Sequence, residues 1–187
     1  MQKIAIIIPC YNEELRLHYS NFEPLFTNLD CDVFLANDGS TDATVSVINK
    51  ITSNNPNRCF LLNYTQNSGK ATTIYKAFKE IHSRNHYDYL GYFDADFSTP
   101  STEILRILEE LKNLQPEFLF ASRIQLLNSG IQRKYYRHII GRIIVTLLNL
   151  KFRLGIYDTQ CGAKLFSSSM ISIAFEKPFF TSWLFDV

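Results

Sequence analysis

The chain alternates short apolar runs with segments of helical hydrophobic period, and this alternation constrains the fold more than any other feature. Five runs rich in β-branched or aromatic residues end in turn residues, which is typical of buried parallel strands. They span residues 3–8, 33–36, 58–64, 87–93 and 117–121. Between them apolar residues recur at helical spacing, as in Ile74, Phe78 and Ile81. Strands alternating with helices predict an α/β fold, a Rossmann-like three-layer sandwich around a mostly parallel sheet.

The length and composition of the chain suit one such domain. A chain of 187 residues with 46% hydrophobic and 20% charged residues can bury a full core and is neither disordered nor collagen-like. The four cysteines form no CxxC pair, so we expect buried thiols rather than a zinc site or a disulfide framework. Residues 1–187 are therefore expected to form a single domain.

Three polar clusters follow predicted strands. They are Tyr11-Asn12-Glu13, Asn37-Asp38-Gly39-Ser40 and Asp94-Ala95-Asp96. Because ligands of parallel sheets bind beyond the carboxyl ends of the strands, these clusters predict one shared site. We also expect Ser40 or Thr41 to cap the helix that follows the second cluster.

The third cluster places two carboxylates one residue apart. Asp94 and Asp96 would point to the same side if the preceding strand continued through them. Two carboxylates this close repel each other unless a cation or hydrogen-bond donors compensate them. Mg or Mn is the natural compensator, completed by phosphate oxygens and water. The alternative is an ordinary solvated loop, since such pairs also occur by chance.

The motifs PCYNEE, NDGSTD, NSGK and DAD, in this order, resemble family-two glycosyltransferases of the GT-A fold over nearly the whole chain. The resemblance implies that the first two clusters grip the base and ribose of a nucleotide. The implied residues are Pro9, Tyr11, Asn12, Glu13, Asp38 and Gly39. It also implies that Asp94, with Ala95, contacts a nucleotide-sugar and that Asp96 holds the metal. Lys70 stands at a predicted helix start, where it would add positive charge near the phosphates.

A narrower resemblance rests on Ser122-Arg123, the QRKYYR segment and DTQCGAKLF. These are similar to the polyprenyl-phosphate glycosyltransferases, the dolichol-phosphate mannose and bactoprenol glucosyl synthase group. The resemblance implies contacts to the phosphates of donor or acceptor. The residues expected to contact substrate are Arg123, Arg133, Arg137, Gln160 and Lys164. Asp158 is expected to act as a base or to orient the acceptor; the alternative is that it caps a turn.

Positive charge is concentrated between Glu117 and Asp158, where the chain has seven Lys or Arg and no Asp or Glu, although its net charge is only +1. They are Arg123, Arg133, Lys134, Arg137, Arg142, Lys151 and Arg153. The segment favours an anionic partner on one face, or it is simply solvated surface. A predicted helix over 139–150 lies either at a membrane interface or against the sheet, and it is too short to span a bilayer.

Together these features predict inverting transfer of a hexose from a nucleoside diphosphate sugar, of the UDP-glucose or GDP-mannose type, to a polyprenyl phosphate. Asp94, Asp96, Asp158 and Arg123 are the expected catalytic residues, with Mg or Mn as cofactor. We expect a protein peripheral to the cytoplasmic face of a membrane, with no nucleic-acid partner.

Two other functions stay open at this point. One is a family-two enzyme that extends a polysaccharide or lipid-linked oligosaccharide at a hydroxyl acceptor. The other is a nucleotide-binding module without catalysis. Because resembling proteins continue beyond the equivalent of Val187, we also expect a domain truncated at its C-terminus.

Overall fold

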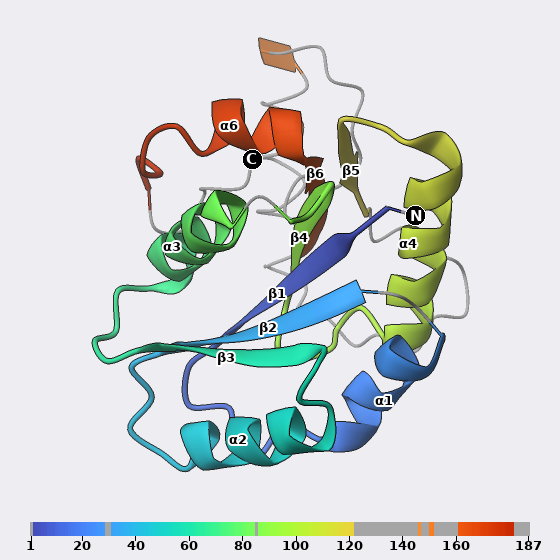
Figure 1. Ribbon diagram of the computed structural model, residues 1–187. Coiled ribbons are helices and arrows are strands. Elements are labelled where there is room, and N and C mark those ends of the chain that lie inside the picture. Colours follow the sequence, from blue (N-terminus) through green and yellow to red (C-terminus); the bar gives the residue numbers. More distant parts are fainter. Residues whose placement is uncertain are drawn as a thin grey trace.

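The computed structural model describes residues 2–28, 31–84, 86–121, 146, 150, 151 and 161–181. In this part of the chain a six-stranded sheet lies between two helical layers (Figure 1). The strands are β1 (Ile4–Cys10), β2 (Cys31–Asp38), β3 (Cys59–Tyr64), β4 (Tyr89–Phe93), β5 (Phe118–Phe120) and β6 (Ala163–Ser167). The helices are α1 (Tyr19–Asn28), α2 (Thr44–Asn54), α3 (Lys70–Ser83), α4 (Ser101–Leu114) and α6 (Ser168–Ala174).

The sheet has the order β3-β2-β1-β4-β6-β5. The first four strands are parallel, whereas β6 runs antiparallel to both β4 and β5. All five predicted strands are present, and the mostly parallel α/β sandwich is confirmed. The sequence did not predict β6, because its AKLFS stretch lacks the β-branched run of the other strands. Its antiparallel course sets Ala163 opposite Phe93, so the residue before β6 lies beside the residue after β4.

Each face of the sheet has its own hydrophobic core, because successive strand residues point to opposite faces. Ile6 and Ile8 of β1 belong to the core that α1, α2 and α4 cover. Ala5 and Ile7 belong to the core on the opposite face, which α3 and α6 cover (Figure 1). The carboxyl ends of β1, β2 and β4 are thereby fixed side by side at one edge of a rigid scaffold.

The predicted helix caps are wrong. Helix α2 begins at Thr44, later than the motif suggested, and neither Ser40 nor Thr41 caps it. Instead the Oδ1 atom of Asp42 accepts a hydrogen bond from the Thr44 backbone N–H at 3.0 Å. The four cysteines are buried, as expected, and none of them forms a disulfide bond. No helix in the described ranges is long and apolar enough to cross a membrane.

Candidate functional site

A cavity of about 220 Å³ opens at the carboxyl ends of β1, β2 and β4. Its walls bring the three polar clusters and the start of α3 together, as the sequence predicted. The lining residues are Pro9, Cys10, Tyr11, Glu13, Arg16, Asp38, Lys70, Asp94, Ala95 and Asp96. Of these, Cys10 and Arg16 were not among the predicted site residues, and Asn12 and Gly39 were predicted but do not line the cavity.

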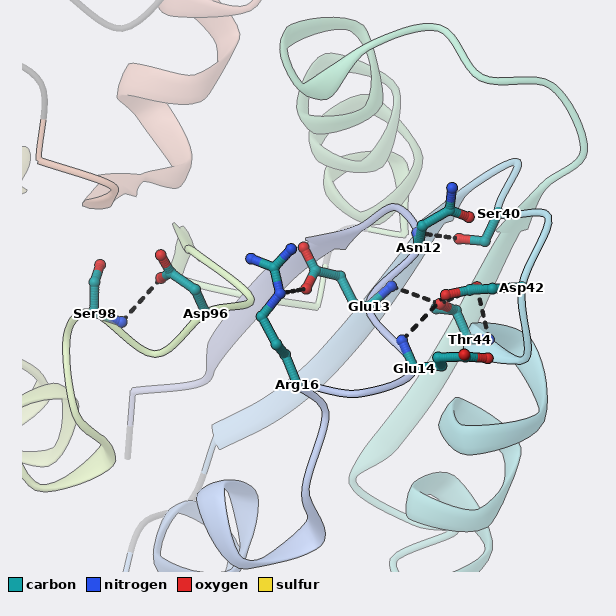
Figure 2. Close-up of polar contacts among 9 residues, drawn as sticks. All are labelled: Asn12, Glu13, Glu14, Arg16, Ser40, Asp42, Thr44, Asp96 and Ser98. Carbon is teal, nitrogen blue, oxygen red and sulfur yellow. Dashed lines mark hydrogen bonds and ion pairs between the residues drawn. The ribbon is translucent and has the colours of Figure 1, made fainter.

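The first two polar clusters are bonded to each other (Figure 2). The Asn12 backbone N–H donates to Oγ of Ser40 at 3.0 Å, and the Thr41 N–H donates to Oδ1 of Asn12 at 2.9 Å. Glu13 donates its N–H to Oγ1 of Thr44 at 2.7 Å. Asn12 adopts a left-handed backbone conformation, with φ of 52°, which Asn tolerates better than most residues. Asn12 therefore joins two loops, and its side chain supports the cavity wall from behind.

The carboxylate after Glu13 has a similar supporting role. Oε2 of Glu14 accepts a hydrogen bond from the Ala43 N–H at 2.8 Å, directly before α2 begins. The Glu14 N–H in turn donates to Oδ2 of Asp42 at 3.3 Å (Figure 2). The first of these bonds satisfies a backbone N–H directly before α2, at the helix end where N–H groups have no partner within the helix. Within this stretch Glu13 therefore faces the cavity, whereas Asn12 and Glu14 hold the loop in place through hydrogen bonds.

Asp38 and Gly39 hold the turn that leads into α3. Asp38 is buried, its Oδ1 accepts from the Ser68 N–H at 2.8 Å, and its Oδ2 accepts from the Gly69 N–H at 2.9 Å. Gly39 has φ of 66°, and a Cβ there would lie 2.5 Å from the backbone nitrogen of Asn67. Only glycine fits this close approach. The two residues therefore set the position of Lys70 at the cavity.

The two acidic residues of the third cluster are held in different ways. Strand β4 ends at Phe93, so the strand does not continue through them and their alignment does not follow from strand geometry. Asp94 pairs through Oδ1 with Nζ of Lys70 at 2.5 Å. Asp96 is exposed, and its Oδ1 accepts from the Ser98 N–H at 2.9 Å (Figure 2). Lys70 therefore supplies counter-charge to the first carboxylate, while both carboxylates still face the cavity.

Gly162, for which no role was predicted, contacts Asp94 closely. The Asp94 N–H donates to the Gly162 carbonyl oxygen at 3.1 Å. A Cβ at Gly162 would overlap the Asp94 carboxylate, at 2.5 Å from Oδ1 and nearer still to Oδ2. The Asp94 carboxylate therefore occupies the space that a side chain at position 162 would need. Only the antiparallel pairing of β6 with β4, which the sequence did not reveal, makes this requirement visible.

The remaining predicted residues belong to the polyprenyl-phosphate resemblance. Lys164 lies on β6 opposite Tyr92, is buried, and does not line the cavity. Five others lie outside the described residues, together with most of the basic segment and of the helix predicted over 139–150. They are Arg123, Arg133, Arg137, Asp158 and Gln160.

The oxygen atoms that the cavity offers as metal ligands fit a hard divalent cation. Asp94 and Asp96 offer carboxylate oxygens, the ligands that Mg²⁺ and Mn²⁺ prefer. The described residues contain no group of three or more His, Cys, Asp or Glu able to hold a metal. One or two carboxylates, completed by water and the phosphates of a substrate, is nevertheless the usual arrangement for Mg²⁺. These residues therefore fit a metal that is bound together with a phosphate ligand.

The surroundings of Glu13 in the cavity disfavour the ionised form of its carboxyl group. Burial raises the pKa of its carboxyl group above the ordinary 4.5, and the nearby charges of Asp96 and Asp42 raise it further. The Arg16 guanidinium opposes this rise through an ion pair of 2.9 Å between Nε and Oε2. Because the net pKa shift is upward, the ionised Glu13 costs folding free energy at neutral pH.

Replacing Glu13 with Gln is therefore expected to raise the stability of the fold at pH 7. A carboxyl group whose pKa is higher in the folded state than in the unfolded state lowers the stability of the protein as pH rises from the unfolded-state pKa through the folded-state pKa. Gln lacks this loss, so its advantage should be present at pH 7 and disappear below pH 4.5. Thermal unfolding of parent and variant across this pH range checks the sign, and a Gln variant that is less stable at pH 7 would contradict it.

Comparison with known proteins identifies the class to which this fold and site belong. Residues 5–175 match the family model described as "Glycosyl transferase family 2". The chain belongs to this family. The sequence resemblance to family-two glycosyltransferases is thereby confirmed.

Curated relatives are similar along almost the whole chain. A dolichyl-phosphate beta-glucosyltransferase from Drosophila melanogaster is 30% identical over 99% of this chain and 60% of its own length. The protein of the same name from Homo sapiens is 29% identical over 100% of this chain and 61% of its own length. The chain thus spans about three fifths of the length of these relatives.

Solved structures confirm the GT-A fold. S. aureus TarS 1-349 in complex with UDP superposes with a TM-score of 0.61 at 16% identity, covering 98% of this chain and 54% of that one. Glucosyl-3-phosphoglycerate synthase from Mycobacterium tuberculosis, solved with Mn²⁺ and UDP, gives 0.58 at 18% identity, covering 91% and 58%. At these identities the likeness establishes the fold alone.

Proposed function

We propose that the protein transfers a hexose from a nucleoside diphosphate sugar to a polyprenyl phosphate, with inversion at the anomeric carbon. The observation that carries the proposal is the cavity at the strand ends, where Asp94, Asp96 and Lys70 meet the Tyr11–Glu13 loop. This set combines groups suited to a metal-bound diphosphate with groups suited to a nucleoside. The names of the curated relatives favour a lipid phosphate as acceptor and glucose as the hexose.

The described residues would each take part in holding the donor. Tyr11 and Glu13 offer a ring and a carboxylate to the nucleoside, while Asn12, Asp38 and Gly39 fix the loops that carry the binding groups. Asp96 and Asp94 would hold Mg or Mn, which neutralises charge on the leaving diphosphate when it is bound. Lys70 lies close enough to add a positive charge at the same place.

The transfer itself then requires positioning more than proton transfer. A phosphate oxygen of the acceptor forms the new bond to the anomeric carbon, and the bond from that carbon to the diphosphate oxygen breaks on the opposite side. The acceptor phosphate is already ionised at neutral pH, so no general base is needed. We assign Arg123, Arg133, Arg137 and Gln160 to the phosphates of donor and acceptor, and Asp158 to acceptor orientation, whereas Lys164 is buried away from the cavity and receives no such role. Such an acceptor places the reaction at a membrane surface, proposed to be the cytoplasmic face.

An acceptor comparison tests this function. The protein is incubated with UDP-glucose or GDP-mannose, Mn²⁺, and either a short-chain polyprenyl phosphate or the polyprenyl alcohol of equal length in the same detergent. We expect a glycosyl phosphate, detected by mass spectrometry, from the phosphate acceptor alone. Transfer to the alcohol, with none to the phosphate, would instead show a hydroxyl acceptor and support the polysaccharide-extending alternative. No transfer from either donor would support a binding module.

A further inference from the structure

Arg16 lines the cavity, although it belongs to none of the sequence motifs from which the site was predicted. It lies on the turn after Glu13, where its backbone N–H donates to the Glu13 carbonyl oxygen at 2.9 Å. Its side chain is 60% exposed, whereas that of Glu13 is only 14% exposed. In Figure 2 the Arg16 guanidinium stands beside the Glu13 carboxylate, on the side of the loop that carries Asp96. A solvent-accessible cation therefore stands at the mouth of an acidic cavity.

The charges on the cavity wall call for such a cation once a donor is bound. Four carboxylates line it, and among the described residues only Arg16 and Lys70 oppose them. Lys70 is engaged with Asp94 at 2.5 Å. A nucleoside diphosphate adds further negative charge beside these carboxylates. Arg16 is the second described cation at the cavity, and its exposed side chain can move to meet this charge.

The contact between Arg16 and Glu13 is suited to exchange. Nε of Arg16 lies 2.9 Å from Oε2 of Glu13, yet Oε2 has no hydrogen-bond donor in the described structure, so the pair is held by charge without hydrogen-bond direction. The guanidinium also carries four N–H donors besides Nε, arranged in a planar fork that matches phosphate oxygens. Both partners can thus gain hydrogen bonds by separating, provided that a ligand supplies a phosphate to one and N–H or O–H groups to the other.

We propose that Arg16 is a further donor-binding residue, which leaves Glu13 for a phosphate oxygen of the nucleoside diphosphate while the Glu13 carboxylate accepts hydrogen bonds from the nucleoside. This inference rests on the proposed function for the class of ligand. It goes beyond that function by giving a role to a residue outside the motifs. Arg16 then binds the phosphate of the ligand, and Glu13 binds its nucleoside.

The test compares ligands that differ only in phosphate. Binding of UDP and uridine, or of GDP and guanosine if the parent prefers them, is measured with Mn²⁺ for the parent and Arg16→Ala, by calorimetry for the diphosphate and by ligand-observed NMR for the nucleoside. We expect the diphosphate to bind about tenfold more weakly to the variant, as for one charged hydrogen bond, and the nucleoside to bind unchanged. Equal weakening of both ligands would mean that Arg16 only positions Glu13, and no weakening would exclude it from the site.

The chain offers a matched control for the loss of an ion pair. Arg106 forms an i,i+3 pair with Glu103 on α4, is similarly exposed at 66%, and does not line the cavity. Arg106→Ala should leave every affinity unchanged. Arg16→Lys should bind the diphosphate more tightly than Arg16→Ala but more weakly than the parent, because Lys supplies the positive charge without the planar set of N–H donors. Full loss in Arg16→Lys together with loss in Arg106→Ala would show a general effect of charge and overturn the proposal.

Two further measurements separate this inference from the proposed function. Mn²⁺ binding alone, followed by electron paramagnetic resonance, should be the same in parent and Arg16→Ala; tighter metal binding in the variant would mean that Arg16 acts on the carboxylates instead of on phosphate. If the parent binds neither nucleotide series, the proposed function fails, and pyrophosphate with Mn²⁺ then tests Arg16 by itself. Equal pyrophosphate affinity in parent and variant, or none in the parent, would refute the inference.

Discussion

Replacing Gly162 with Ala is expected to reduce glycosyl transfer by at least about 100-fold. The backbone of Gly162 does not lie in the left-handed region, so Ala meets no conformational penalty there. Its Cβ would instead overlap the Asp94 carboxylate and force it away from Lys70 and the cavity. A displacement of about 1 Å in a positioned group can cost about 100-fold in rate. The kcat/KM of the purified variant, at saturating metal, measures the effect.

A double-mutant cycle separates this overlap from a general defect in folding. Gly162→Ala should lower the free energy of unfolding in the parent, but much less in an Asp94→Ala background, where the overlapping carboxylate is gone. Equal destabilisation in both backgrounds would show that Ala disturbs β6 itself. Activity close to that of the parent in Gly162→Ala would refute the account of Asp94.

Replacing Asp96 with Asn is expected to remove metal-dependent donor binding and to lower turnover by about 100-fold or more, the scale of losing one group that stabilises developing charge. Asn keeps Oδ1, so the hydrogen bond from the Ser98 N–H persists and the loop is retained. What the variant loses is the negative charge that holds Mg or Mn. Calorimetry with a nucleotide-sugar, in Mn²⁺ and in EDTA, measures the metal-dependent part of binding.

Asp88→Asn is the matched control for this change. Asp88 is also exposed and precedes β4, whereas Asp96 follows it. The side chain of Asp88 likewise accepts a backbone hydrogen bond, from the Lys3 N–H at 2.8 Å. Its variant should keep full donor binding. Both variants should unfold near the temperature of the parent. Retention of metal-dependent binding in Asp96→Asn would remove this residue from the metal site.

The sequence predicted the scaffold and the meeting of the polar clusters at one cavity well, because both follow from short-range patterns. Apolar runs ended by turns marked five strands, and the convergence of strand ends brought Glu13, Asp38 and Asp94 to one cavity. Strand β6 was missed because its five residues include Lys164, Ser167 and no β-branched side chain. Helix α1 was missed because Pro24 interrupts its pattern.

The roles of individual polar residues were harder to predict. A motif shows that Asn12 and Asp38 lie near a strand end, but not whether each side chain faces the cavity or bonds another loop. The structure shows hydrogen bonds to Thr41, Ser68 and Gly69 that depend on segments about 30 residues away. Gly162 depends on the pairing of β6 with β4 across a longer separation. Such contacts leave no periodic signal in the sequence.

A crystal structure of the protein with Mn²⁺ and UDP, or GDP if that binds more tightly, would show directly whether the cavity holds a metal-bound nucleotide. Anomalous scattering locates Mn²⁺ independently of the electron density of the protein. We expect one anomalous peak in contact with a carboxylate oxygen of Asp96 and beside the diphosphate, with the nucleoside against Tyr11 and Glu13. A nucleotide bound elsewhere, or bound in this cavity with Mn²⁺ away from Asp94 and Asp96, would contradict it.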